Sequence, residues 1–146
     1  MKKILITAFL IISTGIIASP EKIYNFQKLK DSMTKEGYSL DYAKKDVGFN
    51  FKKDVSHVEL VGYKNYAETT EALSKMINLI YKNGLTMVPN ESDIGNGIFV
   101  FTYPSKPDYF ALLIADFDNN VIVNSYDKGD QIKKNMEHLK NAHVKK

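Results

Sequence analysis

The stretch 98–126, IFVFTYPSKPDYFALLIADFDNNVIVNSY, decides the fold of this chain. It holds three runs rich in β-branched and aromatic residues, separated by two clusters of turn-forming residues, PSKPD at 104–108 and DNN at 118–120. Runs of this kind between such breaks are typical of strands. We therefore predict an antiparallel meander with strands at 98–103, 109–117 and 121–126.

The first two strands of this meander are apolar on both faces. Phe99 and Phe101 alternate with Ile98 and Val100, and the run 109–117 repeats the pattern. Because successive side chains point to opposite faces, such strands need cover on both sides. Two arrangements would bury both faces of these strands. Helices of this chain lie on both faces, or helices lie on one face and a partner, a ligand or a second copy on the other.

The chain before the meander reads as a helix, three strands and a second helix. Apolar residues recur at three- and four-residue steps over 21–36, which predicts a helix that ends before Gly37. Asn65 stands three residues before Glu68, the spacing of a capping box, and begins a second helix that ends before Gly84. The three strands expected between these helices are 38–43, 47–53 and 57–63.

A last helix at 128–142 completes the expected order of helix, three strands, helix, three strands, helix. This order predicts a single α+β domain whose mainly antiparallel sheet is covered by helices. A shift of 47 residues also aligns 26–48 with 73–95, with Gly37 on Gly84 and Gly48 on Gly95. Either repeat units at about 22–63 and 68–126 descend from a duplication, or shared capping rules make two unrelated units look alike.

The first residues carry the layout of a secretory signal peptide. Met1-Lys2-Lys3 precedes the mainly apolar run 4–17, and small residues follow before Pro20. The apolar run is shorter than the roughly 20 residues that a membrane-spanning helix needs. We expect a signal peptide at 1–18, cleaved after Ala18, and a single mature domain at 19–146. The mature protein is then exported, periplasmic or secreted, and has no membrane span.

Composition excludes several classes of function. The 146-residue chain has no Cys, so it holds no disulfide, thiol nucleophile or cysteine-based metal site. Its net charge of +3 falls close to neutral once Lys2 and Lys3 are removed. All its basic residues are Lys, and the bidentate Arg contacts that favour phosphate and guanine are absent. These features argue against a nucleic-acid partner.

Few residues point to catalysis or metal binding. His57 and Glu59, two apart on an expected strand, share a face and could serve acid–base chemistry. Asp116 and Asp118 begin a calcium-loop spacing that continues with polar residues at 120, 124 and 127, although Val121 stands where such a loop needs Gly. No frame of three metal ligands and no nucleophile motif accompanies either pair. We therefore assign no catalytic, cofactor-binding or metal-binding residue and expect no cofactor.

The functional expectation follows from the apolar meander and the missing catalytic motifs. We expect an exported, non-catalytic module that binds a protein partner, or itself as a homo-oligomer, through an apolar sheet face. Two alternatives remain. One is a small-ligand-binding protein, which needs an apolar cavity between sheet and helices. The other is an acid–base hydrolase that uses His57 and Glu59, or Asp116 and Asp118. No motif identifies a known family.

Overall fold

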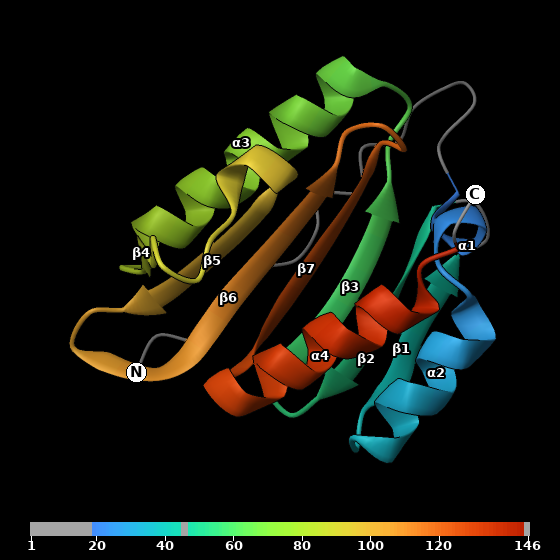
Figure 1. The fold of residues 1–146 in the computed structure, drawn as a ribbon, viewed down its shortest axis with the longest axis horizontal. Helices are drawn as coiled ribbons and strands as arrows, with labels where there is room; N and C mark the ends of the chain where they lie inside the picture. Colours follow the sequence, from blue (N-terminus) through green and yellow to red (C-terminus); the bar gives the residue numbers. More distant parts are fainter. Residues whose placement is uncertain (1–18, 45–46, 145–146) are drawn as a thin grey trace.

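A computed structural model describes residues 19–44 and 47–144, which form one antiparallel sheet with helices on both faces (Figure 1). The helices are α1 (Pro20–Ile23), α2 (Phe26–Lys35), α3 (Tyr66–Lys82), the 3-10 turn η1 (Ile94–Asn96) and α4 (Gly129–Ala142). The strands are β1 (Ser39–Lys44), β2 (Gly48–Lys53), β3 (Ser56–Gly62), β4 (Thr86–Met87), β5 (Ile98–Tyr103), β6 (Lys106–Asp116) and β7 (Val121–Lys128). Their order in the sheet is β1-β2-β3-β7-β6-β5-β4. The expected signal peptide lies outside the described residues.

Side-chain caps and glycines set the ends of the helices. The side-chain oxygen of Asn65 accepts a hydrogen bond from the backbone N–H of Glu68 at 2.9 Å, as the spacing predicted. Asn25 caps α2 in the same way, and this interrupts the helix expected at 21–36, because a cap residue has extended backbone. Gly84 follows α3 with a φ of +90°, a conformation that only glycine adopts without cost.

The β5 edge of the sheet is closed by the segment that precedes it. β4 pairs with only two residues of β5, and the loop after β4 then takes over. Val88 donates its N–H to the carbonyl of Val100 at 2.8 Å, and the N–H of Val100 donates to Ser92 Oγ at 2.9 Å. The backbone of β5 is therefore bonded along this side, and its free edge is short.

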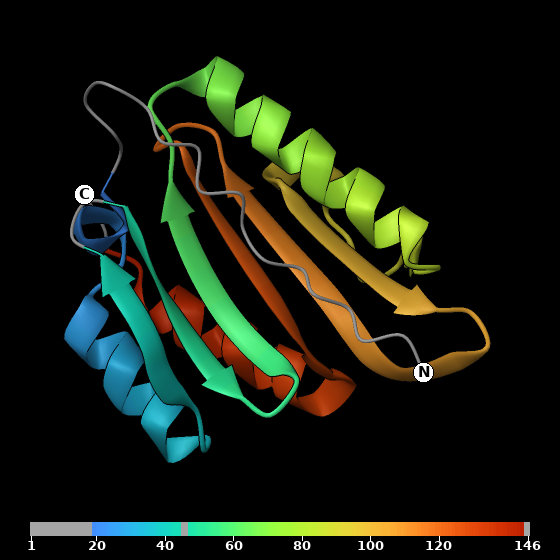
Figure 2. The same cartoon turned by 180° about the vertical axis from the view of Figure 1, so that it is seen from behind.

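The helices divide between the two faces of the sheet. Figures 1 and 2 show α3 on one face, and α2 and α4 on the other. Phe101 and Leu113 pack with α3, whereas Leu112 packs with α4, and none of the three has any exposed area. Both apolar faces of the meander are thus buried by helices of this chain, which explains why its strands are apolar on both sides.

The structure confirms a single α+β domain with an antiparallel sheet, here of seven strands in the described residues. α1, β4 and η1 were not predicted, because two- to four-residue elements are too short to show a periodic pattern. A duplication is not confirmed. β3 and β7 end the two expected repeat units and are antiparallel neighbours in the sheet. A twofold axis that relates them would place α2 and α3 on the same face, but these helices lie on opposite faces. No described helix is long and apolar enough to cross a membrane.

Candidate functional site

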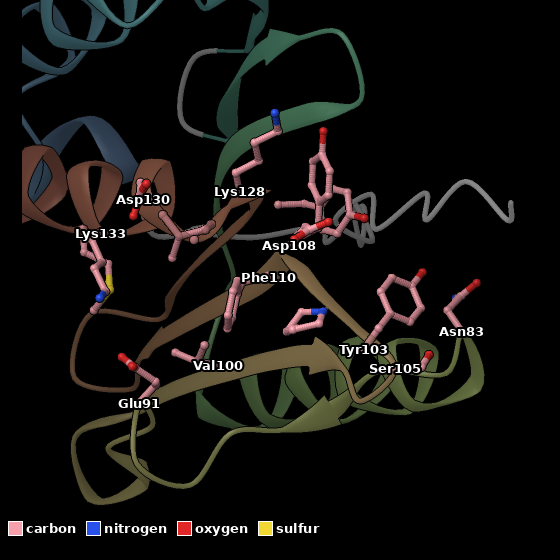
Figure 3. Close-up of a pocket in the computed structure, with 16 residues that line it drawn as sticks. Asn83, Glu91, Val100, Tyr103, Ser105, Asp108, Phe110, Lys128, Asp130 and Lys133 are labelled. Atoms are coloured by element: carbon pink, nitrogen blue, oxygen red, sulfur yellow. The ribbon is translucent and has the colours of Figure 1, made fainter.

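A cleft of about 990 Å³ opens at the end of the sheet where β5 turns into β6. Its walls come from α4, from the loop after β4, from the β5–β6 hairpin and from the last residues of β7. Figure 3 shows Phe110 of β6 between two groups of lining residues, with Asp130 and Lys133 of α4 on one side and Tyr103 on the other.

Neighbouring residues of β6 line the cleft from opposite faces of the sheet, and we call the two groups of lining residues its lobes. Phe110 belongs to the α4 side, where it joins Val100, Ile132 and Met136 in an apolar lobe. Tyr109 belongs to the α3 side and forms an aromatic lobe with tyrosines of the neighbouring strands. Alternation along one strand therefore supplies both lobes.

The aromatic lobe is a preformed stack. The rings of Tyr109 and Tyr126 lie 5.3 Å apart between centroids with an interplanar angle of 21°, and Tyr103 lines the same lobe. Burial, followed by the nearby Tyr103 hydroxyl, raises the pKa of Tyr126 to about 12. The Tyr126 hydroxyl therefore stays neutral at physiological pH and offers a hydrogen bond to a bound group.

The rim of the cleft is charged, and the two signs are mixed. Glu91, Asp108 and Asp130 are exposed acidic residues at the rim, and Lys128 and Lys133 are exposed basic ones. Because neither sign dominates, the rim does not favour a strongly charged ligand. An apolar floor with a polar rim suits a largely neutral group that carries a few hydrogen-bonding atoms.

His57 and Glu59 lie on one face of β3, as the two-residue spacing predicted, but Asn124 of β7 stands between them. His57 Nε2 lies 2.6 Å from Asn124 Oδ1, and Asn124 Nδ2 donates to Glu59 Oε1 at 3.1 Å. The hydroxyl of Tyr42 donates to Glu59 Oε2. We call Tyr42, Asn50, Glu59, Tyr63 and Asn124 the Glu59 cluster.

Electrostatics keep His57 neutral. Burial lowers its pKa, and this outweighs the hydrogen bond to Asn124 and the charge of Glu59, both of which raise it. Because Asn124 Nδ2 donates to Glu59, Asn124 Oδ1 faces the imidazole as an acceptor, so Nε2 carries the proton. His57 and Glu59 thus hold Asn124 in place, and their hydrogen bonds run through this asparagine.

Asp116 and Asp118 are not brought to His57 and Glu59. Asp116 pairs with Val121 at one end of the β6–β7 ladder, whereas His57 pairs with Tyr126 further along β7. The Asp116 carboxylate caps its own turn, accepting from the backbone and the side chain of Asn119 at 3.1 and 2.8 Å. It organises a hairpin turn, which needs no bound ion.

The calcium-loop spacing does not produce a calcium site. Asn124 bonds to Glu59 on one face of the sheet, whereas Asp127 accepts from the Tyr38 hydroxyl on the other. Ligands on opposite faces of a strand cannot converge on one ion. Across residues 19–44 and 47–144, no group of three His, Cys, Asp or Glu side chains is placed to hold a metal.

A second buried polar cluster, under α4, went unpredicted. Asn135 of α4 donates to the Tyr38 hydroxyl at 3.0 Å and approaches Ser125 Oγ at 3.4 Å, while Tyr38 donates to Asp127. These residues come from three elements far apart in the chain, and no local pattern connects them. Their hydrogen bonds tie α4 to β7 and to the segment after α2, which fixes the position of the cleft wall.

Comparison with known proteins adds no relative to these observations. The cleft and the two polar clusters are properties of this chain's own packing. No model of a known protein family matches the chain, and no curated protein or solved structure matches it either.

Proposed function

We propose that this chain is an exported, non-catalytic binding protein and that the cleft beside Phe110 takes up its ligand. The observation that carries the proposal is the cleft itself, about 990 Å³ in volume, with an apolar lobe, an aromatic lobe and a polar rim. Ligand sites in proteins typically occupy about 300–1,000 Å³ and combine an apolar lining with a few polar groups.

The cleft favours this proposal over docking on an open sheet face. The meander strands are buried under α3 on one side and α4 on the other, so their faces offer no area to a partner. A protein partner or a second copy can use the cleft by placing a side chain in it, so the cleft serves the binding-protein, self-association and small-ligand alternatives alike.

The hydrolase alternative has less support. None of His57, Glu59, Asp116 and Asp118 lines the cleft, and the two pairs lie at different places on the sheet. A general acid or base has to reach the proton that it transfers. A substrate held in the cleft would contact none of these four side chains.

Binding of the neutral apolar dye Nile red tests the cleft. We expect the exported protein to enhance the dye's fluorescence saturably. Phe110→Ser should weaken binding by about tenfold, since loss of the apolar contact between the dye and this partly buried ring is worth about 1.4 kcal/mol. Met136→Gln keeps the length of a second wall residue and should weaken binding in the same direction. Val55→Ser is the matched control, because Val55 is 48% exposed and lies outside the cleft.

Equal dye binding by the wild type and both wall variants would place the ligand site elsewhere. Circular dichroism of each variant separates loss of the cleft from loss of the fold. Light scattering over a range of protein concentrations tests whether a second copy of the chain occupies the cleft. A dimer that dissociates in the Phe110→Ser variant identifies self-association. Export is checked separately by the mass of the secreted protein, which should begin at Ser19, and recovery of an unprocessed chain from the cytoplasm contradicts it.

A further inference from the structure

The aromatic lobe of the cleft lies where the β5–β6 hairpin extends past the end of α3 (Figure 2). Tyr81 in the last turn of α3 packs on Phe101 of β5, with the ring centroids 5.7 Å apart. Phe101 is paired with Ala111 of β6, and both are buried. Tyr103 and Tyr109 lie two residues nearer the hairpin turn on the same side of the sheet, and both are only half-buried. The tyrosines at this end of the face are therefore less covered by α3 than the residues before them.

Tyr109 and Tyr126 form a stack with one enclosed ring and one accessible ring. Their centroids lie 5.3 Å apart, with an interplanar angle of 21°. Tyr126 is 8% exposed, whereas Tyr109 is half-buried, and both line the cleft. Because Tyr126 covers one face of the Tyr109 ring, a ligand in the cleft reaches the other face or the edge of that ring. Aromatic rings prefer offset-stacked or edge-to-face neighbours at such distances, so this surface suits a third ring.

The charges beside the stack favour a neutral ring. Lys128 of β7 is paired with Tyr109 of β6, so its side chain lies on the same face of the sheet as the stack. Asp108 precedes Tyr109 in the chain and lines the same cleft. The positive charge disfavours a cationic ligand at this place, and the negative charge disfavours an anionic one. A ring without net charge meets neither penalty.

We propose that the cleft binds a neutral planar aromatic ring, which packs against Tyr109 in the aromatic lobe. Such a ring matches the flat face of a tyrosine, and its apolar area is removed from water on binding. This inference names the ligand class of the cleft, so it rests on the proposed function. The ring belongs either to a free small molecule or to an aromatic side chain of a protein partner, since both present the same surface to Tyr109.

A sugar ring fits the cleft less well, although sugars also stack on tyrosine. A sugar carries several hydroxyls, each of which is costly to bury without a hydrogen-bond partner. Of the described residues that line the cleft, only Val100, Tyr126 and Ile132 are buried, and the Tyr126 hydroxyl is the one polar side-chain group among them. An aromatic ring with one or two polar substituents needs far fewer partners.

A titration with p-cresol tests the proposal, with 4-methylcyclohexanol as the saturated match. The two probes share one carbon skeleton and one hydroxyl group, but only p-cresol is planar and aromatic. The aromatic proton signals of the exported wild-type protein in the nuclear magnetic resonance spectrum report the binding of each probe. We expect p-cresol to bind saturably and about threefold to tenfold more tightly than 4-methylcyclohexanol, because an aromatic pair is stabilised beyond its area burial.

Two substitutions at Tyr109 separate the aromatic face from the bulk of the side chain. Tyr109→Leu removes the face and should reduce the preference for p-cresol to less than about twofold. Tyr109→Phe keeps the face and should bind both probes as the wild type does. Tyr66→Leu is the matched control, because Tyr66 is 64% exposed on α3 and lies outside the cleft.

A capped glycine–tyrosine–glycine tripeptide identifies the source of the ring. If the tripeptide binds more tightly than p-cresol, the peptide backbone contributes to binding and the ring comes from a protein partner. If the tripeptide binds more weakly, the backbone hinders entry into the cleft and the ring belongs to a small molecule.

Two results each overturn the proposal: equal affinity of the wild type for p-cresol and 4-methylcyclohexanol, or a preference for p-cresol that persists in Tyr109→Leu. The first comparison uses the wild type alone, so it holds whether or not Tyr109→Leu folds. Nile red binding that responds to Phe110→Ser, together with equal affinity for the two probes, overturns only this inference and leaves the proposed function standing. If neither Nile red nor p-cresol binds, both are wrong.

Discussion

A series of three glycine-to-alanine substitutions tests how closely the turn after η1 packs on the backbone of β6. Gly97 follows η1 with a φ of +75°, and a Cβ at this position would lie 2.2 Å from the carbonyl oxygen of Ala115. That oxygen belongs to a backbone already held in the sheet, since Ala115 donates its own N–H to Gly97 at 2.8 Å. Gly84 shares the left-handed conformation but has open space, with its nearest atom on Tyr103 at 3.8 Å. Gly95 has neither constraint.

The expected free energies of unfolding follow from these differences. Alanine in a left-handed conformation costs about 1–2 kcal/mol, and the lower entropy of the unfolded chain offsets about 0.4–1 kcal/mol of it. Gly84→Ala should therefore destabilise the protein by about 1 kcal/mol. Gly97→Ala adds a backbone overlap worth about 1–3 kcal/mol, for a total of about 2–4 kcal/mol. Gly95→Ala should change stability by no more than about 0.5 kcal/mol in either direction.

Urea unfolding followed by circular dichroism measures all three variants under one set of conditions. Equal slopes with urea show that the midpoints can be compared as stabilities. The predicted ranking is Gly97→Ala most destabilised, then Gly84→Ala, then Gly95→Ala. If Gly97→Ala were no less stable than Gly84→Ala, the turn after η1 would not be seated on the backbone of Ala115.

Two further predictions concern α3 and His57. Asn65→Ala should lower the free energy of unfolding by about 1 kcal/mol through loss of the cap on α3, whereas Asn78→Ala, on the exposed face of the same helix, should leave it unchanged or slightly higher; equal effects in a urea titration would contradict the cap. Because burial lowers the pKa of His57, the unfolded chain binds a proton that the folded chain does not as pH falls below about 6.5. The free energy of unfolding should therefore decrease as the solution is acidified from neutral pH. The charge of Lys52 also lowers the pKa of His57, whereas the charges of Glu59 and Asp127 raise it and reduce the effect. His57→Gln, which keeps a donor toward Asn124, should show a smaller decrease between pH 7 and pH 5, and a decrease equal to the wild type's would remove His57 as its cause.

Local sequence was enough to place most of the elements. The expected strand 98–103 coincides with β5, and the expected helix 128–142 begins one residue before α4. Alternation and helical spacing report on neighbours within a few residues, so they survive without knowledge of the fold. β6 departs from the expectation at its start, since it begins at Lys106 inside the expected turn. Pro107 is tolerated there because that end of β6 extends past the last residue pair with β7.

The candidate sites were predictable only in part. The shared face of His57 and Glu59 follows from the two-residue period of a strand. The asparagine between them does not, because Asn124 lies 65 residues from Glu59 along the chain and reaches it only when β7 inserts beside β3. The cleft has no sequence signature for the same reason, since its walls combine residues from Asn83 to Met136.

The amino-acid order by itself determined where most of the longer helices and strands lie, which strand residues share a face, and that the meander must be covered on both sides. These properties depend on backbone conformation and burial over a few residues. Only the tertiary structure decided that α3 covers one face and α4 the other, and that β7 lies between β3 and β6. This arrangement depends on contacts between distant segments, whose energies no local pattern records. The cleft results from the same contacts.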